Sequence, residues 1–367
     1  MNRHDFFADP DLVRPEVSAA LAGIVAARHF GLDGEIREVG SEQDRNFVID
    51  APAGRFLLKV SNPAYSDDEL AAQVAGVAHL AGAVPELRFP EPRPSLNGGF
   101  TVRFAPDGGA GAASSEAEPL RARVFSFVPG FPLIDSPYLA PAVVGRLGTV
   151  AARVCAGLAD FRHPGLDRLT QWDVRNARQV CDALAGSLTG HDHVDRDRAE
   201  LLRRAVGEAC DRLDALSPSL RVQAIHGDLT DDNVVCERGV DGRPDPTGVI
   251  DFGDLGFGWV VAELATACAC VLHHDPARPL AVLAAVRAFH EVVALSEAEV
   301  AALWPAIVAR AAVLVTSGVH QARIDPANAY VLDRQQAEWR AFEAAAGLPF
   351  EVAHRAVRDA LGLPGPP

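Results

Sequence analysis

A short stretch of the chain combines residue types that suit phosphoryl transfer. Residues 224–233 read AIHGDLTDDN, and Asp251 closes a second apolar run in the segment GVIDFGD. A phosphoryl-transfer site must orient a hydroxyl group and neutralise the nucleotide's β- and γ-phosphates through a divalent metal. In the order HxDxxxxN followed by DFG, Asp228 is the expected catalytic base. Asn233 and Asp251 would supply hard oxygen ligands of the kind that Mg²⁺ prefers.

Each part of this pattern has an ordinary structural explanation when it is taken alone. Asp228 by itself is typical of a turn or a helix cap, and Asp251 of the end of a strand. Their order, their spacing and the flanking apolar runs together favour a kinase. Lys59 ends the run RFLLKV and would add a strand-borne cation for the phosphates, although an exposed edge lysine is the alternative.

Three further features would complete a nucleotide site. A helix after Lys59 should carry its partner, and both Glu69 and Gln73 remain open because they lie one turn apart. Residues 40–47 lie between two predicted strands, where Ser41 and the backbone amides of a turn would contact phosphate. Phe127, in residues 125–128, lies where two lobes would be connected and where the nucleotide base would bind.

The elements that must position these residues follow from the hydrophobic periodicity. The segment 107–119 is rich in Gly, Ala and Ser and is predicted to be a mobile hairpin loop. Beyond residues 129–130 the patterns are mainly helical, except for strand-like runs in residues 224–261. The expected N-terminal elements are helices at 15–30 and 67–81, and strands at 36–39, 45–50, 56–60, 100–104 and 121–128.

Length and composition predict a soluble globular protein with two unequal lobes. The chain has 367 residues, of which 49% are hydrophobic and 23% charged. The N-terminus lacks the apolar run of a signal peptide, and we expect no membrane span and a cytoplasmic location. The net charge of -15 disfavours binding to nucleic acid or to anionic membranes and weakly favours cationic small substrates.

Cysteine and histidine patterns do not predict a structural metal site. The 6 cysteines are scattered without a CxxC pair, so we expect reduced, mostly buried thiols. The His273–His274 pair and the segment with His191 and His193 have no further ligands at workable spacing. We therefore expect these histidines in solvated loops or at helix ends.

The sequence resembles the aminoglycoside phosphotransferase and choline kinase superfamily, and within it hydroxylysine kinases. The stretches that carry the resemblance are SEQDRNFVI, FLLKVSNP, FVPGFPL, DFRHPGLDRLTQWDV, IHGDLTDDNVV and GVIDFGDLGFGWVVAELA. The last two are specific for the superfamily, whereas FRHPGL and FGDLGFG favour hydroxylysine kinases. The likeness spans roughly residues 15–348.

The resemblance implies an α+β, protein-kinase-like fold with a β-rich N-lobe at residues 1–128 and a helical C-lobe at 129–367. It implies Asp228 as catalytic base, Asn233 and Asp251 as magnesium ligands, and Lys59 on the phosphates of ATP or GTP. His226 would orient the catalytic loop. The oligomeric state is left open.

The acceptor is expected to be a small molecule with hydroxyl and amine groups. Gly227 stands where protein kinases have Arg, and no APE-like segment follows, so a protein substrate is not expected. Asp254 is a candidate for binding the ammonium group, the alternative being a cap for the helix that contains Glu263. Candidate partners for an acceptor carboxylate are Arg310, Arg323 and Arg340.

Three functions remain open from the sequence. The leading hypothesis is a kinase for a hydroxylysine-like metabolite, and the second is an antibiotic-directed aminoglycoside phosphotransferase. A catalytically inactive nucleotide-binding module is the third, although it predicts loss of Lys59, Asp228, Asn233 or Asp251, and all four are present.

Overall fold

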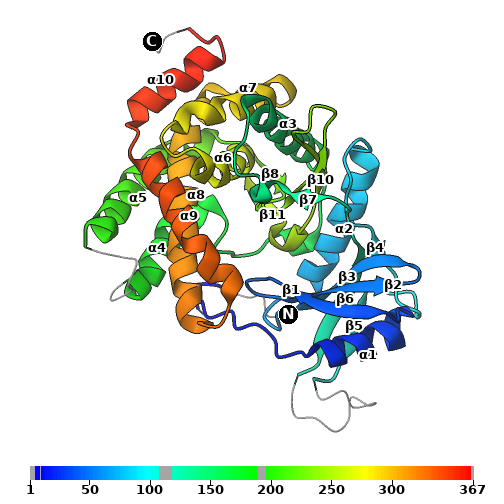
Figure 1. Cartoon of the computed structure of the whole chain (residues 1–367). Helices are drawn as coiled ribbons and strands as arrows, with labels where there is room; N and C mark the ends of the chain where they lie inside the picture. Colours follow the sequence, from blue (N-terminus) through cyan, green and yellow to red (C-terminus); the bar gives the residue numbers. More distant parts are fainter. Residues whose placement is uncertain (1–4, 9, 107–117, 189–195, 365–367) are drawn as a thin grey trace.

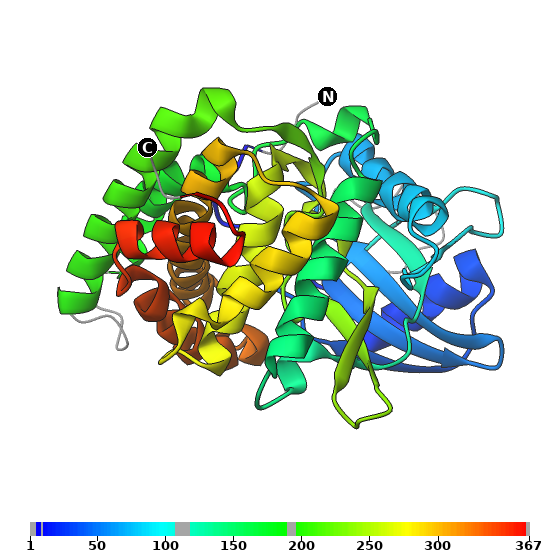
Figure 2. The same cartoon turned by 90° about the horizontal axis from the view of Figure 1, so that it is seen from above.

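The computed structural model describes residues 5–8, 10–106, 118–188 and 196–364, which form two unequal lobes (Figure 1). One lobe is built on an antiparallel sheet and the other mainly on helices, as the view from above also shows (Figure 2). The α+β class is therefore confirmed. His191, His193 and almost all of the predicted loop at 107–119 lie outside the described residues. The division at residue 128 stays a prediction.

The described helices and strands follow the predicted order closely. The helices are α1 (Ala19–Phe30), α2 (Asp67–Ala83), α3 (Pro141–Gly157), α4 (Ala177–Leu184), α5 (Arg196–Leu216), α6 (Val260–Val271), α7 (Leu283–Val292), α8 (Glu297–Ile324), α9 (Ala329–Ala346) and α10 (Phe350–Ala360). The strands are β1 (Glu35–Val39), β2 (Arg45–Ala51), β3 (Gly54–Ser61), β4 (Pro92–Arg93), β5 (Thr101–Phe104), β6 (Leu120–Ser126), β7 (Phe131–Pro132), β8 (Val222–Ile225), β9 (Val234–Arg238), β10 (Pro244–Val249) and β11 (Gly256–Trp259).

The N-lobe sheet places Lys59 on a central strand. Its order is β1-β2-β3-β6-β4, and β5 also pairs with β6. Lys59 on β3 lies opposite Asn46 of β2 and Arg123 of β6. Apolar side chains of α1 and of the sheet, among them Val25 and Leu58, form a separate core. Lys59 is thus held by paired strands on both sides rather than at an exposed edge.

The boundaries of the two N-lobe helices are set by local sequence. The Ser18 side chain accepts a hydrogen bond from the start of α1, and Gly31 ends the helix with a φ of 63°, a conformation that costs glycine little. In α2, Ser66 and Glu69 form a reciprocal capping box. The predicted end of the first helix at residue 30 is confirmed.

Two small sheets in the C-lobe bring the sequence motifs together. Strands β9 and β10, within the region of predicted strand-like runs, form a hairpin with Val234 opposite Val249. The backbone N–H of Ile250 then donates to the carbonyl oxygen of Asn233 at 2.9 Å. This pairing places Asn233 next to Asp251. The other sheet pairs β8 with β11, which lie at the two ends of the motif region.

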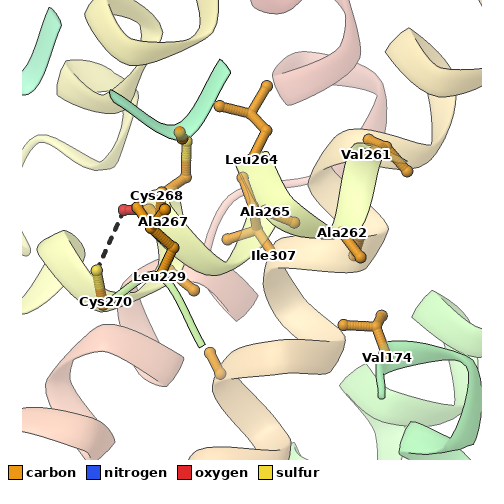
Figure 3. Packing of buried hydrophobic residues seen from close by; sticks show 14 of the residues in the cluster. Val174, Leu229, Val261, Ala262, Leu264, Ala265, Ala267, Cys268, Cys270 and Ile307 are labelled. Atoms are coloured by element: carbon orange, nitrogen blue, oxygen red, sulfur yellow. Dashed lines mark hydrogen bonds between the residues drawn. The ribbon is translucent and has the colours of Figure 1, made fainter. Parts of the chain in front are cut away.

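The catalytic loop is anchored in the main core. Leu229, within the HGDLTDDN segment, is fully buried and belongs to the cluster that packs around α6 and α8 (Figure 3). By length and composition, helix α8 could cross a membrane. However, 89% of its most apolar 18-residue segment is buried inside the fold. We therefore interpret α8 as the central helix of the C-lobe core.

All of the cysteines lie in the described part of the chain. They are free and buried, as predicted for reduced thiols that pack as small apolar side chains. The residues are Cys155, Cys181, Cys210, Cys236, Cys268 and Cys270.

Two glycine substitutions test the close packing of α3 against α7. A Cβ atom added at Gly148 would lie 2.2 Å from the carbonyl oxygen of Ala285, so Gly148→Ala should destabilise the protein by about 1–3 kcal/mol. Gly207, in α5, has nothing within 4 Å of such an atom, and Gly207→Ala should stabilise by about 0.5–1 kcal/mol. Thermal unfolding of both variants is the measurement. Equal changes in Tm would contradict the close approach of Gly148 to Ala285.

Candidate active site

Asp228 is held from two sides at the centre of the site. Its Oδ1 accepts a hydrogen bond from Arg310 of α8 at 2.5 Å, and its Oδ2 accepts one from the Asn233 amide at 2.7 Å. Burial raises the pKa of Asp228, and the Arg310 guanidinium opposes this shift. The carboxylate therefore has a fixed orientation and a greater proton affinity than an ordinary aspartate.

His226 holds the catalytic loop in place through backbone contacts and does not line either of the cavities described below. Its Nε2 lies 3.1 Å from the carbonyl oxygen of Ile250 and must carry the proton, so Nδ1 can accept from the backbone N–H of Asp228 at 3.3 Å. Burial lowers the pKa of His226 to about 4, which keeps the ring neutral. This geometry suits the predicted role of orienting the loop.

Glu263, which sequence reasoning did not select, also holds the catalytic loop. Gly227 has a φ of +81°, and a Cβ atom there would lie 2.6 Å from the carbonyl oxygen of Asp254. The backbone N–H of Gly227 donates to Glu263 Oε2 at 3.1 Å. Glycine at this position is therefore required by backbone conformation and close contact. The only signal for Glu263 in the sequence was its place in the first turn of α6.

The two predicted metal ligands lie together and suit a hard divalent cation. Asp251 has a φ of 59°, the one positive φ outside glycine among the described residues, and such strain is common at functional sites. The Asn233 Nδ2 group donates to the carbonyl oxygen and Oδ2 of Asp228, which directs its amide oxygen away from that residue. A carboxylate and an amide oxygen are thus available for Mg²⁺.

Lys59 meets two carboxylates at the junction of the lobes. Its Nζ lies 2.6 Å from Asp251 Oδ1 and 3.7 Å from Asp44 Oδ2. Burial alone would lower the pKa of Lys59, but Asp251 and Asp44 outweigh it, so the pKa is raised and the ammonium stays charged. Burial alone would raise the pKa of Asp251, but the nearby Lys59 ammonium outweighs this effect, so the pKa of Asp251 is lowered. Asp44 was not predicted.

Neither expected helix partner contacts Lys59, so that expectation is wrong. Glu69 is instead occupied by its cap on α2 and by Arg168, whose Nε lies 3.0 Å from Glu69 Oε1. Gln73 accepts from the buried Arg123 at 2.7 Å and donates to the carbonyl oxygen of Gly253 at 3.1 Å. The presence of Arg123 on the neighbouring strand diverts Gln73 from the lysine.

A largely apolar cavity between the lobes suits the base of a nucleotide. Phe127 lines this cavity together with Val48, Val77 and Phe252, and the cavity reaches Lys59. The backbone N–H of Phe127 donates to the carbonyl oxygen of Arg55 at 3.0 Å. Phe127 can therefore contribute its ring to base binding, while its N–H is already used within the sheet.

The predicted phosphate loop is folded onto the C-lobe. Ser41 lines a second, more polar cavity, and its carbonyl oxygen accepts from the Asn328 side chain at 3.1 Å. A Cβ atom at Gly40 would lie 2.6 Å from the Tyr330 ring, so glycine permits this approach. Gly40, Lys59, Asn233 and Asp251 line both cavities, which connects the two at the predicted phosphate and metal positions.

The polar cavity is rich in half-buried carboxylates. Asp254, Glu42 and Glu338 line it together with Asp228. Burial and the nearby Asp228 raise the pKa of Asp254 to about 7. Burial and neighbouring carboxylates raise the pKa of Glu42 to about 8, and burial raises that of Glu338 to about 8. Helix α6 is capped at Trp259, so the alternative role of Asp254 as its cap is wrong.

One of the three arginines suggested for an acceptor carboxylate reaches the site. Arg310 pairs with Asp228 and stacks on Trp172, with 4.6 Å between the guanidinium carbon and the ring centroid. Arg323 and Arg340 bond elsewhere, to the segment at Gly186 and to Gln336 respectively. The cavity is lined instead by Arg334 of α9, which the sequence did not single out and which pairs with Asp232.

Known proteins resemble this chain in sequence and in fold. The chain is 23% identical to a hydroxylysine kinase from Bos taurus over 368 residues, which cover 95% of this chain and 93% of the relative. A structure described as the microcompartment-associated aminopropanol kinase matches with a TM-score of 0.64 and 19% identity, covering 93% of this chain and 98% of that one. These matches confirm the protein-kinase-like fold.

A third match shows a related fold with nucleotide and metal. It is the amicoumacin kinase hAmiN in complex with AMP-PNP, Ca²⁺ and Ami, with a TM-score of 0.60, 14% identity and coverage of 86% of this chain and 89% of that one. The family model described as "Phosphotransferase enzyme family" matches residues 35–303. The chain therefore belongs to this phosphotransferase family and is a kinase that acts on hydroxyl groups of small molecules.

Proposed function

We propose that the protein transfers the γ-phosphoryl group of ATP or GTP to a hydroxyl of an amine-bearing metabolite similar to hydroxylysine. The observation that carries the proposal is that Lys59, Asn233 and Asp251 line both the apolar and the polar cavity. Asp228 lines the polar cavity beside them. The first cavity would take the nucleotide and the second the acceptor. A location in the cytoplasm stays a prediction.

In this proposal each charged group has a separate task. Asp228 accepts the proton of the acceptor hydroxyl, and its contacts with Arg310 and Asn233 hold it in position. Lys59 contacts the nucleotide phosphates. Ser41 belongs to the loop at residues 40–47, which would also contact these phosphates. Asn233 and Asp251 hold Mg²⁺, which when bound neutralises charge on the β- and γ-phosphates. His226 orients the loop without contacting substrate.

The acceptor site supports a substrate with more than one amine. Asp254, Glu42 and Glu338 can meet ammonium groups, and we propose Asp254 as the first of these contacts. Arg334 lines the same cavity and is the proposed partner of an acceptor carboxylate. Hydroxylysine carries two amines, one carboxylate and one hydroxyl, which suits this set of charges. The name of the relative from Bos taurus supports the same substrate class.

An aminoglycoside is the second candidate acceptor. The observation in its favour is the group of several carboxylates in the polar cavity, because aminoglycosides carry several ammonium groups and no carboxylate. Arg334 favours hydroxylysine over an aminoglycoside, because only hydroxylysine has a carboxylate that this arginine could bind.

The experiment that tests the proposal compares acceptors under equal conditions. Initial rates of nucleoside diphosphate release are measured with 5-hydroxylysine, with lysine as the control that lacks a hydroxyl, and with kanamycin. We expect release with 5-hydroxylysine and none above background with lysine. Faster reaction with kanamycin would reverse the assignment of the acceptor and leave the kinase activity in place.

The pH dependence of acceptor binding tests Asp254. Its pKa is raised to about 7, so the carboxyl is neutral below that pH and charged above it. The apparent KM for the acceptor should fall as pH rises from about 6 to about 9, and Asp254→Asn should weaken apparent affinity by about tenfold at the upper end. The KM for the nucleotide should stay nearly unchanged. An unaltered acceptor profile in this variant would exclude the contact.

A further inference from the structure

A carboxylate and two imidazoles converge in the C-lobe beside the catalytic loop. Asp231 Oδ2 lies 2.9 Å from the Nε2 atom of His273 and 2.9 Å from that of His274. The three atoms lie within 4.8 Å of one another. The sequence hid this arrangement because the histidines follow α6, in the short helix Leu272–His274, far along the chain from Asp231. The expectation that the pair has no further ligand is therefore wrong.

The three side chains suit a first-row divalent metal. Neutral imidazole and carboxylate are ligands for Zn²⁺, with bonds of about 2.0–2.2 Å. Tetrahedral bonds of this length separate ligand atoms by about 3.3 Å. The two distances of 2.9 Å between Asp231 Oδ2 and the histidine nitrogens would therefore need to open by only a few tenths of an ångström. A metal would replace the protons between the nitrogen and oxygen atoms, and each ring could carry its remaining proton on Nδ1.

Burial and packing strengthen this interpretation. The Asp231 side chain is 3% exposed, and those of His273 and His274 are 17% and 5% exposed. The two rings lie tilted against each other with centroids 4.0 Å apart, where two imidazolium charges would repel each other. A bound cation would coordinate the carboxylate and both neutral rings at the same time.

Space for a further ligand lies next to His274. A small cavity is lined there by Tyr138, Leu139, Val271, Arg278 and His274. Zinc sites with three protein ligands usually complete their coordination with water. This cavity lies beside one of the three proposed ligands, His274.

We propose that Asp231, His273 and His274 bind one Zn²⁺ or similar first-row divalent ion. The site is separate from the magnesium ligands and does not depend on the proposed acceptor. Asp231 belongs to the catalytic loop, and its carbonyl oxygen accepts from the backbone N–H of Ile134 at 3.0 Å. The ion therefore ties the loop that carries Asp228 to the end of α6 and stabilises the C-lobe.

Metal titration of the full-length protein tests this proposal. The protein is stripped with a chelator and titrated with Co²⁺ in excess Mg²⁺, both as the parent chain and in an Asp251→Asn background that removes the main catalytic metal ligand. We expect one equivalent of Co²⁺ with the visible absorption of a four-coordinate site in both. His273→Ala and His274→Ala should each weaken binding by on the order of 100-fold or more. His354→Ala, in α10, is the matched control and should bind normally.

The thermal transition provides a second measurement. Zn²⁺ should raise the Tm of the parent and of His354→Ala but not that of His273→Ala, whose partly exposed side chain makes it the variant best able to fold. If His274→Ala does not fold, His273→Ala alone decides the outcome. Absence of four-coordinate Co²⁺ absorption in the parent, or equal affinity in the parent and His273→Ala, would overturn the site. The pair would then be only a hydrogen-bonded anchor for Asp231.

Discussion

Replacing Asp228 by asparagine is expected to reduce turnover by about 100-fold or more. The amide has nearly the same shape but cannot accept the proton of the acceptor hydroxyl. It also lowers the charge opposite Arg310, which remains buried at 1% exposure, so some loss of stability should accompany the loss of activity. Nucleotide affinity should change little, because Lys59 and Asp251 are intact. Steady-state kinetics, nucleotide titration and thermal unfolding measure these three effects separately.

The matched control is Asp245→Asn, an exposed carboxylate on β10 that contacts Arg146 outside the site. It should retain parental turnover. If Asp228→Asn keeps turnover within a few-fold of the parent, Asp228 is not the base and the mechanism proposed for this site is wrong.

Removing the carboxylate of Asp251 should abolish activity. Asp251→Ala deletes the main proposed magnesium ligand, and it also takes the 2.6 Å partner from the buried Lys59. Because both the metal and the lysine are affected, raising the Mg²⁺ concentration should not restore turnover fully. Activity as a function of Mg²⁺ concentration is the measurement, with folding followed by circular dichroism. A folded variant with the parental Mg²⁺ dependence would show that the metal is held elsewhere.

The elements that local sequence determines could be predicted well. The end of α1 at Gly31 and the hairpin between Asn233 and Asp251 both follow from turn residues and apolar alternation. Asp228, Asn233 and Asp251 could be selected because one short motif and one strand end contain them. The family match and the fold confirm the kinase assignment that these residues suggested.

Contacts between distant segments could not be predicted in the same way. Whether Glu69 or Gln73 meets Lys59 depends on Arg168 and Arg123, which lie on other elements and compete for these side chains. Sequence periodicity places a residue on one face of a helix but does not say which partner faces it.

The residues that line the acceptor cavity and the partner of the histidine pair also come from distant segments, so they could not be predicted either. Glu42 comes from the phosphate loop and Glu338 from α9, and no local pattern connects them. Arg310 could be named only as one of three arginines, and Arg334 was missed. Asp231 lies inside a recognised motif, yet its contact with His273 requires the packing of α6 against the catalytic loop.

Detection of a phosphate ester on the acceptor would demonstrate phosphoryl transfer by this protein. The protein is incubated with 5-hydroxylysine and ATP or GTP, with and without Mg²⁺, and the products are followed by phosphorus NMR. We expect a new phosphate ester that appears only with Mg²⁺ and is lost in Asp228→Asn. Nucleotide binding without any ester, from 5-hydroxylysine or from a panel of amino alcohols and aminoglycosides, would contradict this expectation and indicate an inactive nucleotide-binding protein.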